Sequence, residues 1–144
     1  MPALKLATFC EKVIIDANSV PSLIGLFSQF KVTVPEGTTF PANAAAPKEW
    51  SLFCIWECSP EEAGREFDQV FEVRTPDGSL FSPPQTIKMK PQVDKLRQNV
   101  IANAQAIPIG LPGMISVTTR VEQNGKVVVA VMTYSFEVLY VKSN

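Results

Sequence analysis

MISVTTRVEQ (114–123), NG (124–125) and KVVVAVMTYSFEVLYV (126–141) together decide the fold class of this chain. The two longer runs are rich in β-branched and aromatic residues, which favour strands. Asn124-Gly125 between them is the strongest short-range signal for a hairpin, because both central residues of a type I′ turn need positive φ and Asn and Gly tolerate it best. The carboxy-terminal third is therefore predicted to form a long β-hairpin.

The rest of the chain repeats the same alternation of short apolar runs and turn residues. Ser59-Pro60-Glu61-Glu62 has the form of a helix start, with Ser as N-cap and Glu at the third position, so one helical turn is expected there. For 91–99 the sequence leaves helix and loop open. Strands are expected at 3–15, 20–28, 50–58, 66–75 and 98–107. Residues 30–34 either continue the second strand past a bend or begin another. Residues 79–82 and 86–90 flank Pro83-Pro84, so the strand there is short, interrupted or at an edge.

These elements predict one all-β domain that spans residues 1–144. Short strands without the long helices of a parallel sheet indicate an antiparallel β-sandwich, immunoglobulin-like or jelly-roll, with about seven to nine strands and at most one or two short helical turns. A chain of 144 residues with 46% hydrophobic residues is large enough for a single core. The connection at 35–48, with three prolines, is too short to separate two cores.

Charge and composition exclude several function classes. The formal net charge is -1, so no overall field attracts nucleic acid or an anionic membrane surface. The chain has no His, which removes the Ser-His-Asp and Cys-His catalytic pairs and the His-containing metal sites. The sequence shows neither a signal-peptide pattern nor a membrane-spanning run, and it has only three cysteines. We therefore expect a cytoplasmic protein without a cofactor.

Cys54 and Cys58 form a C-x3-C pair that suggests a metal site. In a strand, these two residues lie ~13 Å apart, which is too far for adjacent ligands or for a disulfide. Cys10 is the only other thiol, so Cys and His cannot complete a four-coordinate zinc site. The sequence therefore predicts no metal, with Cys10 and Cys54 as small buried hydrophobic residues and Cys58 exposed beside a turn.

The densest acidic region extends from Glu57 to Glu72. Its spacing matches no calcium-binding loop, and basic residues are interspersed, so a solvated face is the simpler interpretation. A carboxylate-based hydrolase stays open as a weaker alternative, with candidate residues Glu57, Glu61, Glu62 and Asp68.

One face of the last predicted strand is a candidate interaction surface. Tyr134, Phe136, Val138 and Tyr140 alternate on that face, and the preceding run 127–131 is apolar throughout. Such a strand must be covered, either by the opposing sheet or by another molecule. We expect these four residues to contact a protein partner or a second copy of the chain.

Two stretches carry a resemblance to a known group of sequences. Ala7-Thr-Phe-Cys-Glu-Lys-Val13, followed by Ser22-Leu-Ile-Gly-Leu-Phe27, resembles a family of small uncharacterised bacterial all-β proteins, a domain of unknown function, and Pro76-Asp77-Gly78 and 111–125 extend the likeness. The resemblance implies a cytosolic bacterial sandwich and no catalytic residues.

The expected function is non-enzymatic. The sequence favours a binding or assembly module of a bacterial or phage complex that associates with itself or with another protein, but not with nucleic acid or a membrane. The alternative is a sandwich that binds a small, saccharide-like ligand at one end, where a cleft with aromatic side chains would be the distinguishing feature.

Overall fold

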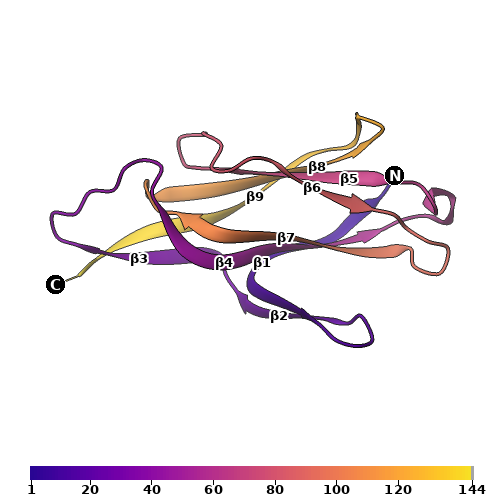
Figure 1. Cartoon of the computed structure of the whole chain (residues 1–144), viewed down its shortest axis with the longest axis horizontal. Coiled ribbons are helices and arrows are strands. Elements are labelled where there is room, and N and C mark those ends of the chain that lie inside the picture. Colours follow the sequence, from indigo (N-terminus) through magenta and orange to yellow (C-terminus); the bar gives the residue numbers. More distant parts are fainter. Residues whose placement is uncertain (144) are drawn as a thin grey trace.

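A computed structural model describes residues 1–143 and shows two β-sheets packed face to face (Figure 1). The four-stranded sheet has the order β2-β1-β4-β7, and the five-stranded sheet has the order β3-β9-β8-β5-β6. Strands of the first sheet are β1 Ala3–Ile15, β2 Pro21–Leu26, β4 Ala45–Glu57 and β7 Arg97–Pro108. Strands of the second are β3 Gln29–Pro35, β5 Phe67–Arg74, β6 Gln85–Met89, β8 Gly113–Gln123 and β9 Lys126–Ser143.

The predicted β-sandwich is confirmed, with a strand number at the upper end of the expected range. One strand pair departs from a purely antiparallel arrangement, because β3 runs parallel to β9, with Gln29 beside Glu137 and Pro35 beside Ser143. The chain leaves the first sheet after β2 and enters the second at Ser28, whose carbonyl accepts the N–H of Glu137. This crossover joins sheets rather than neighbouring strands, so it does not impose the antiparallel direction of a hairpin.

The Asn-Gly turn forms as predicted. Asn124 and Gly125 both have positive φ, 52° and 77°, and Gln123 pairs with Lys126 across the hairpin. Positive φ at both central residues is the type I′ geometry that matches the twist of the flanking strands. This hairpin places β8 and β9 side by side in the middle of the five-stranded sheet.

The predicted helical turn is present as the 3-10 helix η1, Pro60–Glu62. Residues 91–99, for which the sequence leaves helix and loop as alternatives, are not helical. A tight turn pairs Gln92 with Lys95, and β7 begins at Arg97. Alternating apolar residues from Asn99 onward thus belong to a strand, as the pattern predicted.

The core lies between the two sheets and is centred on aromatic side chains. Phe9 and Trp50 project from the four-stranded sheet and Phe136 from the five-stranded sheet, and Phe27 joins them from the β2–β3 connection. Ring centroids in this cluster are 5.1 to 6.5 Å apart, within the range in which aromatic pairs attract beyond their burial. These contacts connect the two layers directly.

Candidate functional site

The face predicted to meet a partner lies inside the sandwich, so this prediction is corrected. Phe136 and Val138 are 0% exposed and belong to the core cluster. β9 is not an edge strand, because β3 and β8 pair with it on either side. The apolar alternation of β9 is explained by the opposing four-stranded sheet, which covers this face.

The two tyrosines of that face are half-buried against the same core. The Tyr140 hydroxyl donates to the carbonyl oxygen of Ile109, and its ring lies 5.9 Å from that of Phe40. The Tyr134 hydroxyl approaches the sulfur of Met132 at 3.7 Å. Burial raises the pKa of both phenols, so they remain neutral at physiological pH.

The candidate carboxylates do not converge. Glu57 ends β4 and pairs with Lys5 and Arg97, whereas Asp68 lies on β5 opposite Lys88 and Glu122. Glu61 is exposed on η1. The structure therefore brings no two of the predicted acids into a shared cavity among residues 1–143, and a glycosidase-type pair would need such an arrangement.

Among the four candidate carboxylates, Glu62 is the one that is buried, and its contacts hold the local structure together. Its Oε1 accepts hydrogen bonds from the Met1 ammonium at 2.9 Å, from the Ser59 hydroxyl at 2.9 Å and from the Ser59 backbone N–H at 3.2 Å. Burial acts to raise the pKa of this carboxyl, but the hydrogen bonds and the ammonium charge outweigh it and lower the pKa. Glu62 is thus an ionised anchor that holds η1 against the amino terminus.

All three cysteines are buried free thiols. This confirms the interpretation of Cys10 and Cys54 and corrects that of Cys58, which is only 4% exposed. Its backbone N–H donates to the carbonyl of Leu96, which places Cys58 at the end of the β4–β7 ladder. Burial raises the pKa of each thiol, for Cys54 to about 11. Within residues 1–143, no group of three acidic or cysteine side chains is placed to hold a metal ion.

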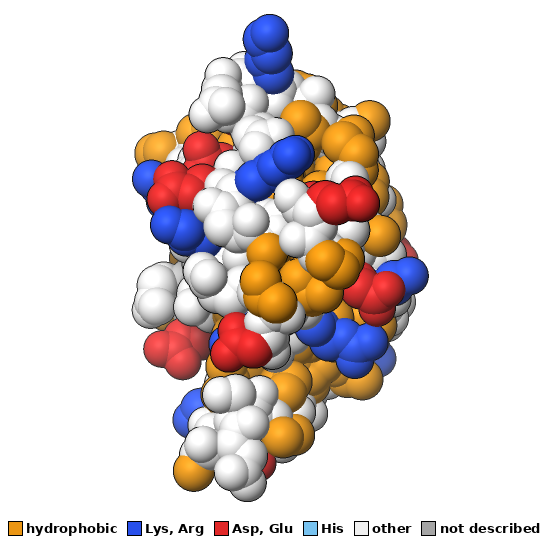
Figure 2. Space-filling view, turned by 90° about the vertical axis from the view of Figure 1, so that its right-hand side faces the viewer, with side chains coloured by type: hydrophobic (Ala, Val, Ile, Leu, Met, Phe, Trp, Pro, Cys, Tyr) orange, Lys and Arg blue, Asp and Glu red, His pale blue; other side chains and the backbone are white. Residues whose placement is uncertain are grey.

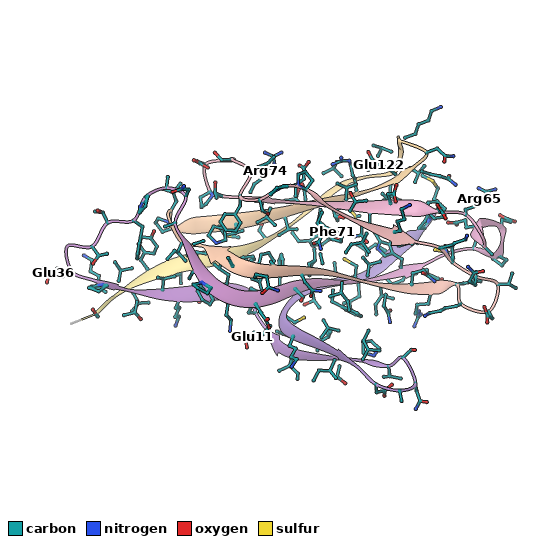
Figure 3. All side chains as sticks on the ribbon, in the orientation of Figure 1. Glu11, Glu36, Arg65, Phe71, Arg74 and Glu122 are labelled. Carbon is teal, nitrogen blue, oxygen red and sulfur yellow. The ribbon has the colours of Figure 1, made fainter. Side chains whose placement is uncertain are left out.

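A cavity of about 370 Å³ lies between the sheets, and we call it the β7 cavity. One wall is β7, and the connection from Phe81 to Gln85 forms the opposite wall. Trp50, Leu52, Phe71, Val73 and Val117 form the floor. Figure 3 shows Phe71 between the two layers, whereas the labelled charged residues lie at the periphery.

Small side chains on β7 create this space. Ala102, Ala104 and Ala106 occupy successive inward positions, because side chains alternate along a strand and every second residue faces the core. Three methyl groups in a row leave a gap that larger core residues would fill. The indole N–H of Trp50 donates to the carbonyl of Ala106 at 2.8 Å, which fixes the ring on the cavity floor.

The chemistry of the lining is apolar with a few amides. No charged residue lines the β7 cavity in the described part of the chain, and its polar residues are Ser82, Gln85, Asn103 and Gln105. Such a site suits a neutral, mostly apolar group held by one or two hydrogen bonds. The signal in the sequence is the ANAQA pattern of 102–106, whose alternation predicts a strand and whose small alanines leave room for a cavity.

A second hollow and the β1–β2 hairpin are two further features of the surface. A smaller hollow of about 230 Å³, lined partly by Glu11, Glu49 and Asn103, lies against the same part of β7. The β1–β2 hairpin extends away from the sandwich in Figure 1. Several of its large apolar side chains are exposed. These are Ile14, Ile15, Val20, Ile24 and Leu26, the last 65% exposed.

Charge is distributed evenly over the visible end of the molecule. In Figure 2, basic and acidic side chains are interspersed with apolar ones and no single-sign patch stands out. Glu72 on β5 pairs with Arg74 at 3.0 Å and with Arg120 of β8 at 3.6 Å, and Arg120 also pairs with Glu122 at 3.3 Å. Along residues 1–143, no helix has the length and apolar character of a membrane span.

Comparison of the chain with protein-family models finds no match, and comparison with curated proteins likewise finds none.

Proposed function

We propose that this chain is a non-enzymatic binding module of the bacterial cytoplasm that accepts an apolar group in the β7 cavity. The observation that carries the proposal is the cavity itself, about 370 Å³ in volume, with aromatic and aliphatic walls and no charged lining residue in the described chain. Its volume lies within the range of ligand pockets. An enzyme would need reactive groups at this place, and the lining offers only a hydroxyl and amides.

The lining residues also favour an apolar ligand over a saccharide. A saccharide, the alternative expected from the sequence, presents many hydroxyl groups that need hydrogen-bond partners when buried. Only four polar residues line the cavity, all of them exposed, and two of these, Asn103 and Gln105, alternate with the inward alanines of β7, so they supply few such partners. An aromatic or branched aliphatic group fits the floor of Trp50, Leu52 and Phe71 better, because its burial removes apolar surface from water on both sides.

Titration with N-phenyl-1-naphthylamine, a neutral and mostly apolar fluorescent dye, tests the proposal. Trp50 on the cavity floor would transfer excitation energy to a bound dye. Filling the cavity by Ala104→Phe should weaken dye binding at least about tenfold, equivalent to ~1.4 kcal/mol. The smaller fill Ala102→Leu should weaken it less.

Leu26→Ser is the matched control, because it removes the most exposed apolar side chain of the β1–β2 hairpin and leaves the cavity unchanged. Dye binding within about twofold of wild type is expected for this variant. Unaltered binding in folded Ala104→Phe and Ala102→Leu proteins, or a loss confined to Leu26→Ser, would contradict the proposal.

A further inference from the structure

β7 is the least protected edge of the sandwich. It is 12 residues long and pairs on one side only, with β4. The other three edge strands have features that discourage pairing: β2 is short and contains Gly25 at positive φ, β3 ends in Pro35, and β6 follows Pro83-Pro84. Gln98 to Pro108 contains no charged residue, although charge is a common means of blocking an edge.

The phase of the β4–β7 ladder shows which backbone groups point outward. Cys58 donates its N–H to the carbonyl of Leu96 at 3.0 Å, so this pair is a hydrogen-bonded one. Hydrogen-bonded and non-hydrogen-bonded pairs alternate in an antiparallel ladder. Because Glu57 lies beside Arg97 in the register, the residues whose backbone N–H and C=O groups point away from β4 are Arg97, Asn99, Ile101 and Asn103.

We propose that this edge pairs with the β7 edge of a second copy, joining two four-stranded sheets across a twofold axis at Ile101. An antiparallel pair centred there places Ile101 of one copy opposite Ile101 of the other. Asn99 of each copy then lies opposite Asn103 of the other copy. Arg97 then lies opposite Gln105. Amides both donate and accept, so Asn opposite Asn is self-complementary, and no two like charges face each other.

This self-complementary pairing, without facing like charges, favours a second copy over an unrelated strand. The twofold arrangement makes the same patch serve both partners, as closed homodimers require. The outward backbone groups supply main-chain hydrogen bonds, and the centre of the contact is apolar. The second copy would also extend along Ala102 and Ala104, so that it borders the β7 cavity. The dimer does not depend on what the cavity binds.

Sedimentation and light scattering at micromolar concentration test the pairing. The expected mass is twice 15.8 kDa. Ile101→Lys places two ammonium groups directly opposite each other and should restore the monomer. Thr118→Lys is the matched control: it adds the same charge on β8, which is paired on both sides, and should remain dimeric. A monomeric wild-type protein, or a dimer that survives Ile101→Lys, would overturn the proposal.

Crosslinking tests the register independently of charge. Only position 101 faces itself, so Ile101→Cys should form an intermolecular disulfide on mild oxidation. Asn99→Cys alone should not, because its own counterpart lies ~13 Å away along the strand, beyond the ~7 Å limit for a disulfide. The native thiols are buried and do not compete. Crosslinking of Asn99→Cys, or none with Ile101→Cys, would refute this register.

Discussion

Gln69 is the polar side chain enclosed most completely by the core, with 0% exposure. Its Oε1 accepts the indole N–H of Trp56 at 2.8 Å, and its Nε2 donates to the hydroxyl of Thr119 at 3.0 Å. The amide therefore links β5 to β4 in the opposing sheet and to β8 in its own. Because a buried polar group without a partner is costly, these three side chains depend on one another.

Replacing Gln69 by Met tests this network at nearly constant volume. The change leaves the Trp56 N–H and the Thr119 hydroxyl without their partners, and the free energy of unfolding should fall by about 1 to 3 kcal/mol. Urea unfolding at 25 °C measures the difference. Gln92→Met, at an exposed turn position, is the control and should change stability by less than about 0.5 kcal/mol. Equal stability of Gln69→Met and wild type would show that the network adds nothing.

Among the elements, the β8–β9 hairpin depends most directly on a local conformation. A Cβ at Gly125 would meet no atom within 4 Å, so a substitution there meets no steric contact with the rest of the fold. The penalty comes from the backbone alone, since φ is 77° and a β-branched residue disfavours that region. A substitution at Gly125 therefore measures the strain of the turn backbone without a change in packing.

Gly125→Val should therefore destabilise the protein by about 1 to 3 kcal/mol, the usual cost of a strained backbone residue. Gly125→Asn is the matched variant, because Asn tolerates positive φ, and it should lose distinctly less. Thermal unfolding of both proteins measures the difference. If Val and Asn at this position were equally stable, the turn would not hold the conformation described.

At the scale of the whole molecule, the buried thiols and phenols make stability depend on alkaline pH. Burial raises the pKa of Cys54 from 9.0 to about 11, with a smaller opposing effect of the hydrogen bond from Gln69. The unfolded chain thus releases this proton at lower pH than the folded one. The contribution is fully present below about pH 9 and is lost as pH rises toward 11.

Cys54→Ala isolates this contribution. The stability difference between wild type and variant should stay constant from pH 7 to 8 and then fall by about 2 to 3 kcal/mol in total between pH 9 and 11. Chemical unfolding at a series of pH values provides the measurement. A difference that stays constant through pH 11 would mean that the thiol titrates normally in the folded state.

Local sequence determined much of this architecture. The Asn124-Gly125 turn, the capping pattern at Ser59 and the strand nature of β7 from Asn99 onward were all predictable, because turn chemistry and side-chain alternation act over a few residues. The alternation of β9 also showed that one of its faces must be covered. These features follow from backbone sterics and from the burial of apolar surface, which neighbouring residues already express.

Tertiary structure alone decided what covers each face. Phe136 and Val138 meet the opposing sheet, which the alternation of β9 could not distinguish from a partner. Ala102, Ala104 and Ala106 border a cavity because β7 is an edge strand that faces the Phe81–Gln85 connection across the sandwich. The parallel β3–β9 pair depends on contacts between residues more than 100 positions apart in the chain, and the β1–β4, β4–β7 and β5–β8 pairs also join residues that are far apart in the sequence. Such contacts are set by the packing of the whole domain, and no local pattern encodes them.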